Sequence, residues 1–216
     1  MFIQRSTVMR LSACLLAGAM VCSTAAIAQE AEVGHPEPDI ISSSWVLDFE
    51  WDTPKAIAVA DPAGKLTWYW FMTYKVTNHT GQERLFVPEF EVSDDTGRIL
   101  AANRGIPPTV YAEVERVVGN PLLKSPTQAV GRLLQGDDFA LESVAIWEAA
   151  YEDIDQMNVF VGGLSGETAT IEHPDPDIDE TIQLRRTRML TFSAPGFYES
   201  VQYQPIEIDV EQDVMR

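Results

Sequence analysis

Apolar residues recur at every second position over two stretches between residues 45 and 77. Trp45, Leu47, Phe49 and Trp51 alternate in this way, which predicts a half-buried strand. The segment 66–77 is the strongest strand signal. It carries one face of Trp68, Trp70, Met72, Tyr74 and Val76 and an opposite face with Tyr69 and Phe71. Because both faces hold large apolar groups, we expect a central strand that is covered on both sides.

Further strand patterns lie at 56–60, 84–93, 143–149, 157–162, 168–172 and 181–193. Residues 61–64, 78–81 and 94–97 have the Asn, Asp and Gly chemistry of turns. Pro88 interrupts one of the strands and cannot donate to a ladder, which indicates an edge position or a bulge. Weak alternation near the C-terminus ends in an acidic tail. The pattern predicts a mainly β fold, an antiparallel β-sandwich.

The apolar period becomes helical after Pro107. Val110, Val114 and Val117 predict a first helix that Gly119 ends. A second helix is predicted from Ser125, with Gln128 completing a capping box and Gly136 ending it. We therefore expect a two-helix insertion at 107–135, within a sandwich that spans 45–194.

The first 28 residues have the three parts of a secretory signal. Arg5 and Arg10 precede the apolar stretch 11–21, and an Ala-x-Ala triplet ends at Ala28. We predict cleavage between Ala28 and Gln29, followed by a flexible acidic leader at 29–44 and an acidic C-terminal segment at 195–216. Lipidation of Cys22 is a minor alternative, because Met20 and Val21 are poor residues before such a cysteine.

Cleavage changes the charge and the redox chemistry of the chain. It removes both cysteines, so no disulfide is expected in the mature protein. It also leaves 13 Lys and Arg against 33 Asp and Glu, a formal charge of −20. Phosphate backbones and anionic lipids repel such a chain, so nucleic acid is not an expected partner. No transmembrane span is expected in the mature chain.

Three motifs carry a family resemblance: Tyr74 to Gly81, Pro88 to Val92, and Asp94 to Gly97. Over residues 68–163 the chain resembles telokin-like, immunoglobulin-fold domains of bacterial secreted proteins. The whole chain also resembles uncharacterised exported proteins of bacteria such as planctomycetes. The resemblance implies an immunoglobulin-like sandwich and an exported location, periplasmic or secreted, but no activity.

No residue pattern marks catalysis or a cofactor. His35, His79 and His173 are widely separated, which disfavours a zinc site. Asp175, Asp177 and Asp179 are weak calcium candidates because alternating carboxylates supply oxygen ligands. The stretch 163–167 nearly matches a G-x-S-x-G nucleophile elbow but has Glu167 in place of the second glycine. Its glycines are interpreted as backbone devices for a bulge and a turn.

Two further groups of residues have a functional and a structural interpretation. Trp68, Trp70 and Tyr74 alternate as a sugar-stacking face would, but a sandwich core needs the same pattern. Arg185, Arg186 and Arg188 form the dense basic cluster of an acidic chain. Arg186 and Arg188 share strand parity with apolar Leu184 and Leu190. They would pair with acidic neighbours or bind a partner's acidic surface.

The sequence therefore predicts an exported, non-catalytic binding or structural module. Its partner would be an envelope or extracellular protein, or a glycan. A carbohydrate-binding module using the strand aromatics is the alternative, and a hydrolase is the third hypothesis. Partner identity, oligomeric state and calcium binding are left open by the sequence.

Overall fold

A computed structural model describes residues 35–42, 44–149, 154–175, 177–193 and 201–216, which belong to one compact unit. The predicted signal peptide, Cys22, Ala28 and Gln29 lie outside the described residues. Within these residues, none of the helical segments is long and apolar enough to cross a membrane.

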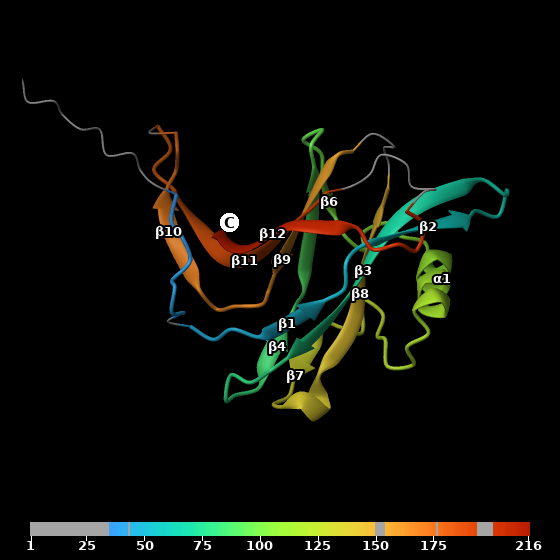
Figure 1. The fold of residues 1–216 in the computed structure, drawn as a ribbon. Coiled ribbons are helices and arrows are strands. Elements are labelled where there is room, and N and C mark those ends of the chain that lie inside the picture. Colours follow the sequence, from blue (N-terminus) through green and yellow to red (C-terminus); the bar gives the residue numbers. More distant parts are fainter. Residues whose placement is uncertain (1–34, 43, 150–153, 176, 194–200) are drawn as a thin grey trace, which may run out of the picture. The chain divides into compact units, whose positions relative to one another are not determined.

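The first of two large antiparallel sheets is built around β3 (Leu66–Thr77). Along one edge β3 pairs with β1 (Asp48–Trp51) and β2 (Lys55–Ala60). Along the other edge it pairs with β8 (Leu141–Glu148). The predicted central position of this strand is confirmed (Figure 1).

The second sheet has six strands. In chain order they are β5 (Glu89–Asp94), β6 (Ile99–Ala101), β9 (Gln156–Gly162), β10 (Thr168–Glu172), β11 (Thr181–Ser193) and β12 (Glu207–Met215). The sheet order is β10-β11-β9-β5-β6, and β12 pairs with β11. The chain beyond residue 194 therefore contributes a strand to the sheet.

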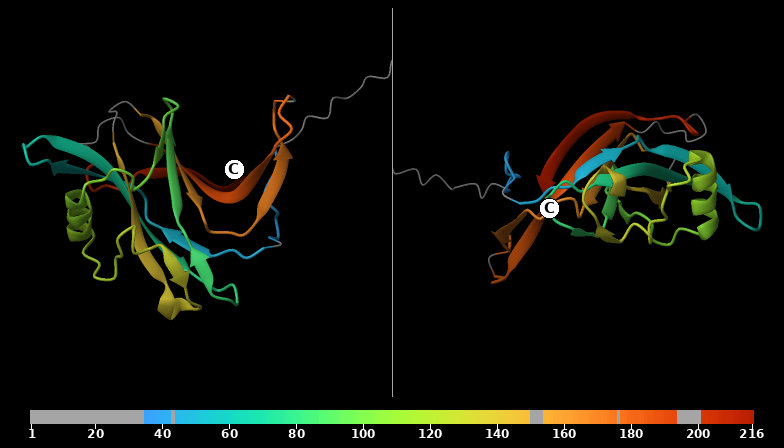
Figure 2. Two further views of the ribbon diagram at one scale, coloured as in Figure 1. Left: turned by 180° about the vertical axis from the view of Figure 1, so that it is seen from behind. Right: turned by 90° about the horizontal axis from the view of Figure 1, so that it is seen from below.

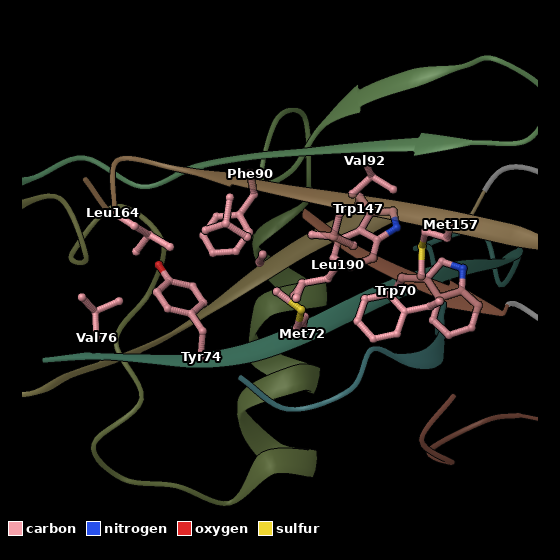
Figure 3. Packing of buried hydrophobic residues seen from close by; sticks show 14 of the residues in the cluster. Trp70, Met72, Tyr74, Val76, Phe90, Val92, Trp147, Met157, Leu164 and Leu190 are labelled. Atoms are coloured by element: carbon pink, nitrogen blue, oxygen red, sulfur yellow. The ribbon is translucent and has the colours of Figure 1, made fainter. Parts of the chain in front are cut away.

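The two sheets pack face to face on one apolar core. Trp70, Met72 and Tyr74 from β3 meet Phe90 of β5 and Leu190 of β11 (Figure 3). These side chains come from alternate positions of their strands, as a half-buried strand requires. The mainly β, antiparallel sandwich architecture is thus confirmed.

A helix covers the outer face of the four-stranded sheet. α1 (Pro108–Val118) begins at a proline and ends at Gly119, whose left-handed φ of 64° closes the helix. Its buried Val110 and Val114 pack with Tyr69 and Phe71 of β3. Figure 2 shows the helix beside this sheet. The first predicted helix and the two-sided burial of β3 are confirmed.

The second predicted helix is wrong. Gln128 accepts the Ser125 amide as a capping box would, at 3.0 Å, but the turn stops there. Residues Gly131–Leu133 instead form β7, which pairs with β4 (Arg84–Phe86). A short 3-10 turn at Asp137–Phe139 follows. The insertion has one α-helix because cross-strand pairing with β4 outweighs a short local helical preference.

Pro88 separates two strands that belong to different sheets. The pattern at 84–93 predicted a single strand, but β4 ends at Phe86 and β5 begins at Glu89. Proline lacks the amide that a continuous ladder would need. The break lets β5 join the six-stranded sheet while β4 pairs with β7.

Candidate functional site

The inner face of β11 changes from apolar to charged along its length. Leu190 and Phe192 are fully buried in the core. At the same parity, Arg186 lies opposite Met215 of β12, and Arg188 lies opposite Asp213. Both guanidinium groups therefore sit on the inner face of the sheet, next to the end of the apolar core.

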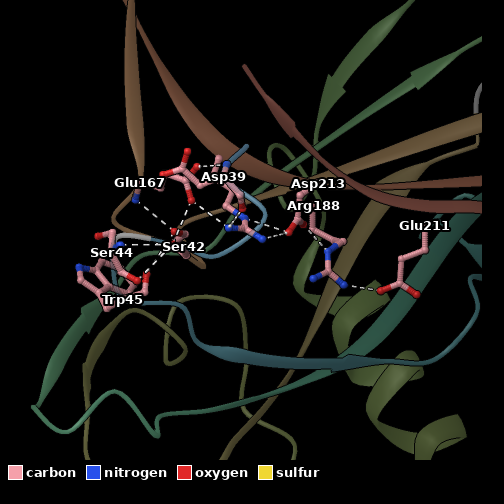
Figure 4. Close-up of polar contacts among 10 residues, drawn as sticks. Asp39, Ser42, Ser44, Trp45, Glu167, Arg188, Glu211 and Asp213 are labelled. Carbon is pink, nitrogen blue, oxygen red and sulfur yellow. Dashed lines mark hydrogen bonds and ion pairs between the residues drawn. The ribbon is translucent and has the colours of Figure 1, made fainter. Parts of the chain in front are cut away.

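An ion-pair cluster surrounds these arginines (Figure 4). We define it as Asp39, Ser42, Glu167, Arg186, Arg188, Glu211 and Asp213. Arg186 donates to Asp213 at 2.6 Å and to Glu167 at 2.8 Å. Arg188 donates to Asp213 at 2.6 Å and also pairs with Glu211. The structural interpretation of the basic cluster, pairing with acidic neighbours, holds for both residues. Arg185 points to the other face, 3.9 Å from Glu89.

The cluster anchors the N-terminal segment, residues 35–42, to the sheet. The Asp39 amide donates to Glu167 Oε1 at 2.7 Å, and the Ser42 hydroxyl donates to Glu167 Oε2 at 3.0 Å. Arg186 also reaches the carbonyl of Asp39. The later part of the predicted leader thus contacts the fold through Glu167, while residues 29–34 lie outside the described ranges.

Hydrogen bonds keep the carboxylates of Glu167 and Asp213 ionised. Burial alone would raise the pKa of Glu167, but donation from the Asp39 amide, Arg186 and Ser42 outweighs it and lowers the pKa. Burial likewise opposes ionisation of Asp213, and the hydrogen bonds from Arg188 and Arg186 lower its pKa below the ordinary value. Glu167 and Asp213 are therefore charged and paired with arginine at neutral pH.

A groove of about 540 Å³ separates the N-terminal segment from β12. One wall is made by residues 35–40, and the other by Arg186 and residues 212–215. Consecutive side chains of a strand point to opposite faces. Because four consecutive residues of β12 line the groove, it runs along the edge of that strand.

Two isoleucines stand next to the groove with almost no burial. Ile40 and Ile41 are 102% and 87% exposed. They lie between Asp39 and Ser42, which both bind Glu167. The segment is thus fixed at either side of an apolar dipeptide that contacts almost nothing else.

The aromatic residues considered as an alternative sugar-binding face pack in or against the core, as a sandwich core requires. Trp70 is 1% exposed and Tyr74 is 4% exposed, whereas Trp68 is half-buried. Burial raises the pKa of Tyr74 to about 12. Stacking on a sugar requires an exposed ring face, so Trp70 and Tyr74 are unsuited to that role.

The weak calcium candidates lie in the connection between β10 and β11. Asp175 accepts the Asp177 amide at 3.0 Å and donates its own amide to His173. In the part of the chain that the structure describes, no group of three or more His, Cys, Asp or Glu is arranged to hold a metal ion. Asp175 and Asp177 thus bond to each other in the turn of this connection, in which Asp179 also lies.

The histidines lie apart in the fold and make separate contacts. His79 pairs with Asp48 at 2.6 Å and with Asp137 at 3.3 Å on the surface. The Asp48 hydrogen bond is the main cause of a raised His79 pKa. His35 lines the groove, and His173 accepts the Asp175 amide within the loop between β10 and β11.

The near match to a nucleophile elbow is a structural turn. The Ser165 hydroxyl donates to the carbonyl of Trp45 at 3.1 Å and accepts the Glu167 amide. Gly163 has a φ of 83°, and a Cβ there would lie 2.3 Å from the Val87 carbonyl oxygen. The interpretation of these glycines as backbone devices agrees with this geometry.

Sequence reasoning missed five members of the cluster, because Glu211 and Asp213 were treated only as part of an acidic C-terminal segment. Asp39 and Ser42 fall in a stretch assigned to a flexible leader, and Glu167 appeared only as a departure from a motif. The sequence signal was the parity of Arg186 and Arg188 with apolar residues, for which pairing with acidic neighbours was one of two interpretations.

Comparison with known proteins yields no relative. No family model, no curated protein and no solved structure matches the chain. The resemblance to telokin-like immunoglobulin domains stays a prediction.

Proposed function

We propose that this chain is an exported, non-catalytic binding module of the bacterial envelope or extracellular space, and that it contacts a partner protein at the groove beside β12. The single observation that carries the proposal is the exposed Ile40–Ile41 pair on a segment fixed by Glu167. Apolar groups that are exposed and held in place favour association, because binding buries them without further ordering of the chain.

The energy available from these two side chains is appreciable. Complete burial of one isoleucine side chain contributes about 1.5 to 3 kcal/mol. The N-terminal segment is already anchored through Asp39 and Ser42, so little conformational entropy is lost when a partner covers it. The surrounding carboxylates would select partners of opposite charge.

Site-specific photo-crosslinking in the producing cells tests the proposal. A photoreactive amino acid at position 40 is expected to trap one protein in stoichiometric amount. The same group at Leu66, which is 61% exposed at the far end of the β2–β3 hairpin, is the matched control and is expected to trap none. In a separate affinity capture, the tagged wild-type chain should retain the same protein. The tagged double variant Ile40→Ser with Ile41→Ser should not. Equal crosslinking from positions 40 and 66, or none from position 40, would contradict the proposal.

A further inference from the structure

The outer edge of β12 has no strand beside it among the described residues. β12 pairs only with β11, and no backbone hydrogen bond of the described ranges reaches its other edge. The Arg185 and Arg216 amides donate to each other's carbonyls. Alternation from this hydrogen-bonded pair directs the backbone of Gln212 and Val214 toward β11. The backbone N–H and C=O groups of Glu211, Asp213 and Met215 therefore point away from the sheet, into or beside the groove.

The N-terminal segment faces this edge but cannot complete the ladder. Pro36 and Pro38 lack amide hydrogens, so this stretch donates poorly to a neighbouring strand. The Asp39 amide is already bound to Glu167. The result is a groove with an open strand edge on one side and a fixed, extended wall on the other.

The charge of the groove determines which kind of segment can bind in it. The groove and the ion-pair cluster hold five carboxylates, Glu37, Asp39, Glu167, Glu211 and Asp213, against two guanidinium groups, Arg186 and Arg188. A second copy of this chain would bring the same acidic edge, and residues 29–34 are acidic as well. Like charges placed opposite each other on paired strands are destabilising. Both of these occupants are therefore disfavoured.

The geometry points to strand addition by a basic, extended segment of a partner protein along the outer edge of β12. This inference rests on the proposed function and specifies its mode. Residues of the added strand on the inner face would lie beside Glu211 and Asp213 and would be Lys or Arg. Those on the outer face would lie beside Gln212 and Val214 and would be apolar or neutral. The partner segment thus alternates basic and apolar residues.

The test uses two synthetic eight-residue peptides as probes, an alternating Lys-Val peptide and an alternating Glu-Val control. Fluorescence anisotropy measures binding to the purified full chain. The Lys-Val peptide is expected to bind, and the Glu-Val peptide is not. Hydrogen exchange should slow at the amides of Glu211, Asp213 and Met215. The amides of Gln212 and Val214, which already pair with β11, serve as internal controls.

Two variants of Glu211 separate the contribution of the backbone amide to peptide binding from that of the side-chain carboxylate. Glu211→Ala removes the carboxylate and keeps the outward amide, whereas Glu211→Pro removes both. Loss of one backbone donor is expected to weaken Lys-Val binding roughly tenfold in the proline variant relative to the alanine variant. A Lys-Val peptide N-methylated at alternate residues makes the same test on the unaltered protein and should bind roughly tenfold more weakly than the parent.

Strand addition would be overturned if the proline and alanine variants bound the Lys-Val peptide equally and the methylated peptide bound as tightly as its parent. It would also be overturned if the Lys-Val peptide did not bind. Crosslinking from position 40 would survive these outcomes if only the mode of binding were wrong. Loss of that crosslinking as well would overturn the proposed function itself.

Discussion

Two glycines after β9 have no room for a side chain. A Cβ on Gly166 would lie 2.3 Å from Trp45 Nε1 and 2.6 Å from the Ser44 hydroxyl oxygen. Gly163 combines a left-handed φ with an equally close approach to the Val87 carbonyl. These contacts bring the chain at 44–47 against the loop 164–166, where Leu47 donates to the Leu164 carbonyl. The two glycines thereby fix the course of the loop that places the Glu167 carboxylate against Asp39 and Ser42 of the N-terminal segment.

Gly163→Ala is expected to destabilise the fold by about 3 kcal/mol or more, because left-handed strain and a steric clash coincide. Gly97→Ala is the matched control. Gly97 has a nearly equal φ of 81° but open space around the added Cβ, so about 1 kcal/mol is expected. Chemical denaturation of both variants makes the measurement. Equal losses would show that the Val87 contact contributes nothing.

At the scale of elements, the start of β11 and the end of β12 are joined to the N-terminal segment by charge rather than by apolar packing. Side chains of Glu167 and Asp213 are mostly buried and accept from Arg186, and removal of one partner would leave a buried charge. Arg186 occupies a core parity because its partners come from three different segments of the chain.

This arrangement predicts a dependence on acid. The pKa of Glu167 is lowered below its ordinary value of 4.5, so its stabilisation is complete above that value and is lost as the pH falls through the folded pKa. Glu167→Gln should cost about 2 kcal/mol at pH 7, and the difference from wild type should shrink as the pH falls below 4.5 toward 3. Thermal unfolding across this pH range measures the effect.

Glu83→Gln is the control for that experiment. Glu83 pairs with Arg132 on the surface, and such exposed pairs contribute about 0 to 1 kcal/mol. A difference for Glu167→Gln that stays constant between pH 7 and pH 3 would contradict an ionised Glu167 as the anchor of the N-terminal segment.

At the scale of the whole molecule, the excess of negative charge is the main influence on how fast partners associate. The expected mature chain carries 33 carboxylates against 13 cationic side chains. Such an excess produces a long-range field that accelerates association with basic partners and is screened by salt. Specificity at the groove then depends on short-range contacts at β12 and Ile40.

Association with the alternating Lys-Val peptide should therefore slow as salt increases. We expect the association rate constant to fall roughly tenfold or more between about 0.05 and 0.5 M NaCl, measured by stopped-flow fluorescence. A Gln-Val peptide of equal length is the neutral control and should show little change. A rate for the Lys-Val peptide that does not respond to salt would contradict electrostatic steering.

Much of the sandwich is legible in the sequence because apolar residues recur at every second position along at least part of each strand and turn residues bound the strands. The predicted strands at 66–77, 168–172 and 181–193 agree with β3, β10 and β11 at both ends. Large apolar residues at every second position leave one favourable burial for such strands. The helix at Pro108–Val118 was likewise predictable, since Pro107 and Gly119 mark its ends.

Other elements depend on which segments meet. Ser125 and Gln128 have a valid helix signal, yet residues 131–133 pair with β4, 45 or more residues earlier in the chain. A local pattern does not report the gain from such a distant ladder. The split of 84–93 at Pro88 was visible only as an irregularity, because the two sheets that receive its halves are products of the fold.

The sequence by itself determined the strand periods, the turn positions and the charge of this protein, since these follow from local chemistry and composition. It also placed Arg186 and Arg188 at the parity of apolar residues, with pairing to acidic neighbours as one interpretation. Only the tertiary structure decided that Asp39, Ser42, Glu167 and Asp213 supply them, and that β12 leaves an open edge beside the N-terminal segment. The contacts of Asp39 and Ser42 with Glu167 join residues more than a hundred positions apart, and their geometry exists only once both sheets have packed on their shared core.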